Sequence, residues 1–303
     1  MKKGGTEPLA VASGFLAPHP LATASGSVLS GFGTHRFCVT ISKRMETKRN
    51  LPRIAASSYL NTAPLIWSFI EGSQRDAVEL LTDTSPARCA EMLANNEVDA
   101  ALVPVIEYQR IPNVEMIPDV CVGSRSAVRS VVLVTRRNNL KKVERVALDS
   151  SSRTSIALVK ILFREFLKFE PEWASSQPDL KLMLTRADAA LIIGDPAMKI
   201  PRDQFRVFDL ATLWHEYTGL GFVFAMWMAR TESVEAARSI DFGAARDEGL
   251  AHLDDIAERY ETDLALTRDE IREYLMQNIA FTMDEDMKKG MNLFFELARK
   301  HSA

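Results

Sequence analysis

The sequence predicts an α/β fold with two lobes, a mostly parallel sheet in each lobe and a helical C-terminal tail. From Arg53 onward, short runs rich in Val, Leu, Ile and Ala alternate with segments of helical period, as in parallel sheets whose strands are joined by helices. Two long β-branched runs, near Val131 and Val223, are typical of strands that cross from one lobe to the other. After Thr231 the pattern is helical to the end of the chain.

Strand-like runs account for most of the apolar residues before the tail. The run that includes Pro104 is expected to break at that residue. In order, the predicted strands are 53–57, 77–83, 98–108, 127–137, 143–152, 187–195, 205–210 and 220–230.

Helices are expected between these runs, over 62–72, 84–97 and 154–169. The second begins with Thr84 or Ser85 as its N-cap and has Pro86 at its first position. The third carries apolar residues at the spacing of a helix that buries one face, namely Ile156, Val159, Leu162, Phe163, Phe166 and Leu167. The helical tail is expected to break near Gly243, Thr262 and Thr282.

The same pattern divides the chain into four segments. We expect an N-terminal extension over 1–50, the first part of lobe 1 over 51–134, lobe 2 over 135–217, and the return to lobe 1 over 218–303. This arrangement resembles the hinged periplasmic binding proteins, in which ligands lie in a cleft at strand ends and helix N-termini.

Residues 1–50 differ from the rest, because they are rich in Gly, Ala, Ser and Pro and show no periodicity. We expect a disordered extension, with Met45 as an alternative start of the chain. A signal peptide is the other interpretation, but Ser13, Gly14 and Pro18 interrupt its apolar stretch.

Composition excludes several classes of partner. The chain has 303 residues, enough for two cores, and its net charge of −3 offers no basic field to nucleic acid or to a membrane surface. The longest strongly apolar run, "GLGFVFAMWMA" from Gly219, is shorter than the roughly 20 residues of a membrane-spanning helix. Cys38, Cys89 and Cys121 have the spacing of neither a disulfide framework nor a metal site, which predicts a reducing, cytoplasmic setting.

Polar clusters occupy three strand-to-helix junctions: "SSYLNTAP", "TDTSPA" and "LDSSSRTSIAL". In the third, Ser152, Arg153, Thr154 and Ser155 precede a strong helix. Free N–H groups at a helix start, hydroxyls and a guanidinium together suit a carboxylate or phosphate. Each Ser or Thr alone could be a helix cap, but together with Asn61 they favour a small anionic ligand.

Motifs of the common catalytic devices are missing from the sequence. It contains no GxGxxG or GxxxxGKS pattern for nucleotides and no GxSxG nucleophile elbow. Outside the extension only His215, His252 and His301 occur, at spacings unsuited to a metal cluster. The sequence therefore predicts neither a metal nor a cofactor.

Six segments resemble, in the same order, the chorismate dehydratase family of the futalosine route to menaquinone. They are "SYLNTAPL" (58–65), "VDAALVPVIEY" (98–108), "VRSVVLVTR" (128–136), "VALDSSSRTSIALVKILF" (146–163), "PDLKLMLTRADAALIIGDPA" (178–197) and "TGLGFVFAMWMAR" (218–230). The dihydroxynaphthoate synthases of the same route have a start more like "SPCPNDT". The resemblance implies a periplasmic-binding-protein type II-like fold.

The resemblance also implies a reaction and a site. The family removes water from chorismate without a cofactor and gives 3-[(1-carboxyvinyl)oxy]benzoate. Asn61 and Ser130 match the positions assigned to catalysis. The positions expected to bind substrate are Ser58, Tyr59, Pro104, Ser152, Arg153, Thr154, Ser155, Gly194 and Asp195. The sequence leaves the proton acceptor and the oligomeric state open.

One departure and two alternatives accompany this interpretation. Val105 and Ile106 stand where relatives often have small polar residues, so that wall of the site is expected to be more apolar. A non-catalytic solute-binding protein for an aromatic or carboxylate ligand would share the lobes and the cleft. A ligand-sensing regulatory domain would need a DNA-binding segment, which residues 1–50 cannot form.

Overall fold

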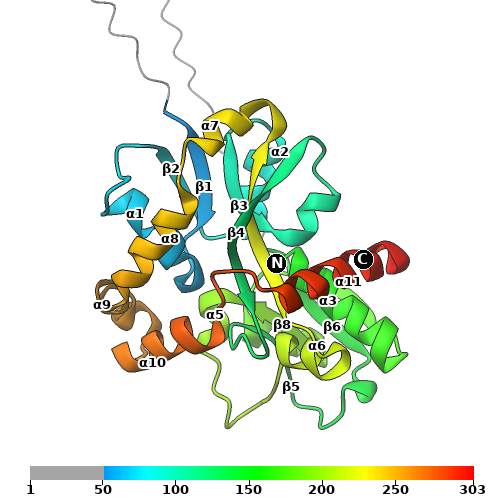
Figure 1. The fold of residues 1–303 in the computed structure, drawn as a ribbon. Coiled ribbons are helices and arrows are strands. Elements are labelled where there is room, and N and C mark those ends of the chain that lie inside the picture. Colours follow the sequence, from blue (N-terminus) through cyan, green and yellow to red (C-terminus); the bar gives the residue numbers. More distant parts are fainter. Residues whose placement is uncertain (1–50) are drawn as a thin grey trace, which may run out of the picture. The chain divides into compact units, whose positions relative to one another are not determined.

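Two five-stranded sheets organise residues 51–303, the part of the chain that the computed structural model describes (Figure 1). The predictions made for residues 1–50 lie outside this part. The first sheet contains β1 (Arg53–Ser57), β2 (Glu79–Asp83), β3 (Ala100–Pro104), β4 (Val114–Ser124) and β10 (Phe222–Arg230). The second contains β5 (Val131–Thr135), β6 (Arg145–Asp149), β7 (Glu172–Ser176), β8 (Ala189–Ile193) and β9 (Arg206–Asp209).

The two sheets have the same topology. Their strand orders are β2-β1-β3-β10-β4 and β7-β6-β8-β5-β9. In the first, β1 is parallel to β2 and β3, and β10 is antiparallel to both β3 and β4. In the second, β6 is parallel to β7 and β8, and β5 is antiparallel to both β8 and β9. Each sheet thus has a single reversed strand, which confirms the mostly parallel α/β prediction.

The reversed strand in each sheet is the first one that follows a change of sheet. Residues 125–130 make the first change, between β4 and β5. The expected lobe boundary after residue 134 therefore falls one strand too late. The second change lies between α6 (Leu210–Thr218) and β10.

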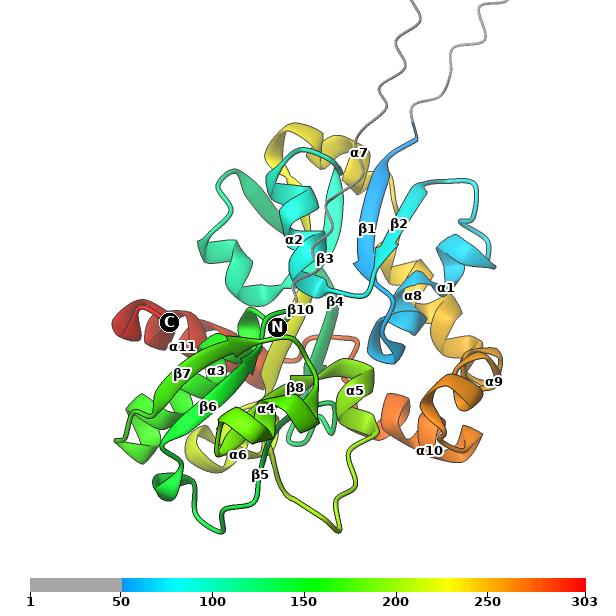
Figure 2. The ribbon, with the colours of Figure 1, turned by 180° about the vertical axis from the view of Figure 1, so that it is seen from behind.

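Helices connect the strands and cover the sheets; Figure 2 shows them from the opposite side. Before β10 they are α1 (Ala63–Ile70), α2 (Pro86–Ala94), α3 (Thr154–Ile161), α4 (Leu180–Arg186), α5 (Gly194–Met198) and α6. The tail contains α7 (Val234–Arg238), α8 (Phe242–Ala251), α9 (Leu253–Leu264), α10 (Arg268–Glu273) and α11 (Glu285–His301). Two π-helices extend helices, η4 (Leu162–Leu167) after α3 and η6 (Tyr274–Asn278) after α10. Short 3₁₀ turns are η1 (Leu60–Thr62), η2 (Val105–Gln109), η3 (Leu140–Lys142) and η5 (Thr231–Ser233).

Some of these elements were not expected. β4 escaped the sequence pattern because Pro118 and Asp119 interrupt it, and Asp119 has a φ of 62°. β7 and α4 are short and were also missed. The breaks expected in the tail near Gly243, Thr262 and Thr282 correspond to the gaps between α7 and α8, between α9 and α10, and between η6 and α11.

The helical tail returns along both sheets. α8 packs against α1 beside the first sheet, and α11 packs against β10 and against α3 of the second sheet (Figure 1). One hydrophobic core contains buried residues from elements of both sheets. It includes some of the largest fully buried side chains, such as Trp214, Trp227 and Tyr274. Within residues 51–303, no helix combines the length and the apolar character that a membrane crossing requires.

Candidate active site

A small cavity lies where strands of the two sheets end and the following helices begin. Parallel strands bring their carboxyl ends to one edge, which is the usual ligand position in open α/β sheets. The cavity is lined by seven of the residues expected from the sequence, Tyr59, Asn61, Pro104, Ser152, Thr154, Ser155 and Gly194. Apolar side chains complete the wall, including Leu102, Val122, Val131 and Phe224. Its volume is about 60 Å³, enough for a few water molecules.

The junction after β1 places Asn61 on this cavity. Ser57 and Thr62 hydroxyls are 2.9 Å apart, and the Thr62 hydroxyl also donates to Asn61 Oδ1 at 3.3 Å. Neither η1 nor α1 has a side-chain cap, so Asn61 is not a helix-capping residue. Pro64 is the second residue of the regular helix behind it, where its fixed φ suits the first turn.

Tyr59 and Gly194 form a close contact between the two halves of the cavity. Gly194 has a φ of +64°, and a Cβ there would lie 2.6 Å from the Tyr59 ring. The neighbouring residues are joined as well, because Leu60 N donates to Asp195 Oδ1 at 3.0 Å. Burial raises the pKa of Tyr59 to about 12 and that of Asp195 to about 6.

The junction before α3 supplies three buried hydroxyls. Ser152, Thr154 and Ser155 are each 3% exposed, and no side chain caps the helix that they precede or begin. Thr154 Oγ1 accepts from Ile106 N of the first sheet's half at 3.3 Å. Behind them burial raises the pKa of Asp149, whose Oδ1 accepts from Ser151 N and Oγ at 2.9 and 2.6 Å.

Arg153 does not line the cavity, contrary to the expectation from its position in the junction. Its guanidinium donates to Glu107 Oε2 at 2.9 Å and to Glu91 Oε1 at 3.1 Å. These contacts run to η2 and α2, so Arg153 joins the two halves of the molecule instead of facing the enclosed space. Glu107, which is 1% exposed, was not among the residues expected from the sequence, although its carboxylate pairs with Arg153.

Ser58 and Asp195 also lie outside the small cavity. Ser58 faces a separate space of about 440 Å³ between α1 and α9, where its carbonyl accepts from the Tyr260 hydroxyl at 2.9 Å. Asp195 lines an outer cleft of about 650 Å³, which Tyr59 also lines. Tyr59 therefore separates the small cavity from the outer cleft. Val105 and Ile106 line neither space, and the apolar wall is formed by other residues.

Ser130 is buried beside the cavity, at the end of the crossing loop, which we define as residues 125–130 between β4 and β5. The Asp209 carboxylate, which also caps α6, accepts from Val128 N at 3.1 Å and from Arg129 N at 2.5 Å. Arg129 has a φ of 63°, and Ser130 O then accepts from Gly194 N at 2.8 Å. This places Ser130 next to two lining residues without exposing it to the cavity itself.

Tyr274 is the residue that sequence reasoning did not find. Its hydroxyl donates to Ser130 Oγ at 2.7 Å, and it lies in the tail, where no motif marks it. Burial raises its pKa, and interactions with the side chains of Ser130 and Asn61 partly offset the rise. Only the fold brings it between the two residues that were expected to be catalytic.

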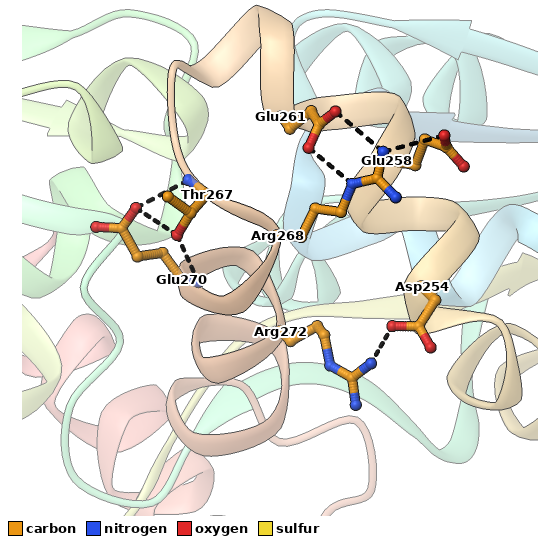
Figure 3. Close-up of polar contacts among 7 residues, drawn as sticks. All are labelled: Asp254, Glu258, Glu261, Thr267, Arg268, Glu270 and Arg272. Carbon is orange, nitrogen blue, oxygen red and sulfur yellow. Dashed lines mark hydrogen bonds and ion pairs between the residues drawn. The ribbon is translucent and has the colours of Figure 1, made fainter.

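Polar contacts fix the helix that leads to Tyr274 (Figure 3). Thr267 and Glu270 form a capping box at the start of α10, which satisfies two free N–H groups. Arg268 pairs with Glu258 and Glu261 of α9. Arg272 pairs with Asp254, which is also in α9.

Among residues 51–303, no three His, Cys, Asp or Glu side chains lie together as metal ligands.

Comparisons of sequence connect the chain with quinone biosynthesis. Residues 52–300 match a family model described as menaquinone biosynthesis. The chain is 32% identical over 235 residues to the chorismate dehydratase of Thermus thermophilus, which covers 70% of the chain and 83% of that protein. It is 28% identical over 204 residues to the chorismate dehydratase of Campylobacter jejuni, covering 67% and 68%.

Comparisons of structure identify the fold. A protein of Archaeoglobus fulgidus superposes with a TM-score of 0.67 at 16% identity, covering 84% of this chain and 99% of that one. The periplasmic aliphatic sulphonate-binding protein of Escherichia coli gives a TM-score of 0.58 at 14% identity, covering 84% and 88%. These likenesses confirm the predicted periplasmic-binding-protein-like fold.

Proposed function

The chain belongs to the menaquinone biosynthesis family, whose model matches residues 52–300, and from this premise we propose that it is a chorismate dehydratase. The observation that carries the proposal is the 32% identity to a chorismate dehydratase across 83% of that enzyme. The site adds support, because the polar residues expected from the sequence gather mostly around one cavity.

The proposed reaction is an elimination that gives an aromatic ring. The proton leaves the ring carbon that carries the enolpyruvyl ether, which is allylic to the carboxylated double bond. The resulting anion is delocalised toward the ring carboxylate, and the neighbouring hydroxyl then leaves, so that the proton and the hydroxide together make water. Because aromatisation provides the driving force, the protein has only to hold a dianion, stabilise developing charge and place a base.

Asn61 is proposed to stabilise the developing negative charge. An amide is not an ordinary base, but it provides N–H donors that need no reorganisation during the reaction. Asn61 lines the cavity, and the Thr62 hydroxyl fixes its Oδ1 side. Ser130, buried beside the cavity, is proposed to hydrogen-bond the leaving hydroxyl or a carboxylate. The proton acceptor is a substrate carboxylate or a neighbouring group.

The start of α3 is proposed to bind a substrate carboxylate. Ser152, Thr154 and Ser155 line the cavity there, and the uncapped N-terminus of the helix adds N–H donors and a favourable dipole. Arg153 is not part of this proposal, because its guanidinium is engaged by Glu107 and Glu91.

Substrate access is proposed to require the two halves to separate. Ligand sites usually measure about 300–1,000 Å³, whereas this cavity measures about 60 Å³. Contacts that would break include Leu60 with Asp195 and Ile106 with Thr154, both of which join the halves. The structure would then represent a closed form of the site.

A solute-binding protein is the alternative with the same architecture. The likeness to the sulphonate-binding protein concerns the fold alone, because the two sequences are only 14% identical. We propose the cytoplasm as the location, on the basis of cysteine usage in the sequence.

Turnover of chorismate by the purified protein tests the proposal. We expect the aromatic product to form at the same rate before and after treatment with EDTA, since the proposed elimination uses no metal ion. Loss of activity with EDTA and its recovery with one divalent metal would contradict the cofactor-free mechanism while leaving the dehydratase assignment intact.

A further inference from the structure

One tyrosine contacts both residues to which we assign catalysis. Tyr274, the first residue of η6, is 1% exposed and lines none of the cavities described above. Its hydroxyl donates to Ser130 Oγ at 2.7 Å. The Asn61 side chain approaches the same hydroxyl and lowers its pKa by hydrogen bonding. A residue from the tail thus joins one group from the β1–α1 junction to another from the crossing loop.

The direction of these hydrogen bonds follows from the number of protons available. A phenol has one proton, and Tyr274 donates it to Ser130, so on the side of Asn61 the phenol oxygen can act only as an acceptor. Ser130 Oγ accepts from Tyr274 and retains its own proton for another acceptor. On Asn61, Oδ1 accepts from Thr62, so the amide NH₂ group is the side available to the phenol and to the cavity.

Both groups are therefore held as donors, which is the polarity that an anionic transition state requires. Without the phenol, the Ser130 hydroxyl would lose its donor and could rotate, and the Asn61 side chain would lose a polar neighbour. Either change would reduce the fraction of molecules with both donors directed at the substrate. Burial raises the pKa of Tyr274, which keeps the phenol protonated and in its donor role at neutral pH.

Tyr274 is itself held firmly in this position. The capping box of Thr267 and Glu270 begins its helix, and the helix widens into a π-helix at Tyr274, a feature that is frequent at functional sites. Farther along, Asn278 Nδ2 donates to Ala127 O at 3.3 Å, so η6 contacts the crossing loop at a second point.

We propose that Tyr274 is a positioning residue for the dehydration, which orients Ser130 and Asn61 as hydrogen-bond donors toward chorismate. The proposal rests on the proposed function, because it gives both partners a role in that reaction. Tyr274 itself touches no substrate, so its hydroxyl should affect kcat and leave KM nearly unchanged.

The variant Tyr274→Phe removes only the hydroxyl. We expect kcat to fall by about 10-fold to 100-fold, less than the ~10²- to 10³-fold typical of a directly acting donor. Tyr260→Phe is the matched control, because Tyr260 is also a largely buried tyrosine whose hydroxyl makes one hydrogen bond, to Ser58 O at 2.9 Å. Tyr260→Phe should keep the wild-type kcat, even if its melting temperature falls by as much as that of Tyr274→Phe.

A double-mutant cycle separates positioning from general loss of structure. In a Ser130→Ala background, Tyr274→Phe should lower kcat by a clearly smaller factor than in the wild type, because part of its action passes through Ser130. An equal factor in both backgrounds would overturn the proposal. So would a wild-type kcat for Tyr274→Phe.

Spectroscopy provides a test if Tyr274→Phe does not fold. With tyrosine labelled at ¹³Cζ, the Tyr274 signal should shift in both Ser130→Ala and Asn61→Ala, and a signal that moves in neither variant would overturn the proposal. The wild-type protein is assayed first. If it does not dehydrate chorismate, the proposed function fails, and the positioning role fails with it.

Discussion

Arg153 and Glu107 form an ion pair, with 2.9 Å between Nη1 and Oε2, that joins the halves of the molecule built on the two sheets. Arg153 precedes α3 after a strand of the second sheet, whereas Glu107 lies in η2 after a strand of the first. The Glu107 side chain is only 2% exposed. Arg110 is its other partner, at 3.3 Å. The pair therefore joins the two halves at a point outside the cavity.

Arg153→Ala should destabilise the protein by about 1–3 kcal/mol, because it leaves a buried carboxylate with one weaker partner. Urea unfolding measures this change. Arg88→Ala is the control, since Arg88 pairs with Glu91 and Glu97 on the surface and should cost less than about 1 kcal/mol. A higher KM for chorismate with unchanged stability would instead indicate that Arg153 binds a carboxylate of the substrate.

Gly194→Ala should reduce both stability and turnover, because a Cβ there would lie 2.6 Å from the Tyr59 ring and the φ of +64° disfavours any side chain. Gly219→Ala is the matched control. Its φ is +70°, but a Cβ at that position meets nothing within 4 Å. The control should lose about 1 kcal/mol from backbone strain alone. Steady-state kinetics should then show a loss of turnover only for Gly194→Ala, and equal turnover in both variants would exclude a functional role for the Tyr59 contact.

Asn61→Ala should lower kcat by about 10²- to 10³-fold while the protein still folds and still binds a non-reactive chorismate analogue. Asn61→Asp should be equally damaging or worse, because a carboxylate repels the developing anion and the dianionic substrate. Rates measured across a range of pH distinguish stabilisation of negative charge from general-base catalysis at this position. If the aspartate retained wild-type turnover, with a rate that rises through its pKa, the position would serve as a base instead.

Asp195 should make stability depend on pH. Burial raises its pKa to about 6 in the folded protein, above the ordinary value of 3.8. The folded state therefore binds the proton more tightly than the unfolded state, and stability falls as pH rises from about 4 to about 6. Compared with Asp195→Asn, the wild type should lose about 2 kcal/mol across this window and remain level above it. A pH-independent difference in unfolding free energy between the two proteins would contradict the raised pKa.

Local sequence pattern predicted the strands and the junctions well. β1, β3, β8 and β10 are fully or largely buried runs, and such runs between helical segments are readable without a structure. β4 was not readable, because Pro118 and Asp119 break its pattern, and its pairing depends on β10, about a hundred residues later. Because β4 was not predicted, β5 was assigned to the first lobe, although it belongs to the second sheet.

The site was only partly predictable. Ser152, Thr154 and Ser155 follow a strand and precede a helix, so their place on the cavity could be expected from the junction. The direction of the Arg153 side chain depends on Glu107 and Glu91, which come from other elements. Tyr274 depends on the return of the tail to the crossing loop, which no local pattern encodes.

The most direct test of the account is to incubate the purified protein with chorismate and to follow the products by ¹H NMR and mass spectrometry. We predict that the signals of the cyclohexadiene ring disappear, that aromatic signals of a 3-substituted benzoate replace them, and that the mass falls by one water. The Asn61→Ala variant should be far slower under the same conditions, which excludes a contaminating activity. Chorismate that binds the wild-type protein and is recovered unchanged would contradict the dehydratase assignment and favour a solute-binding protein.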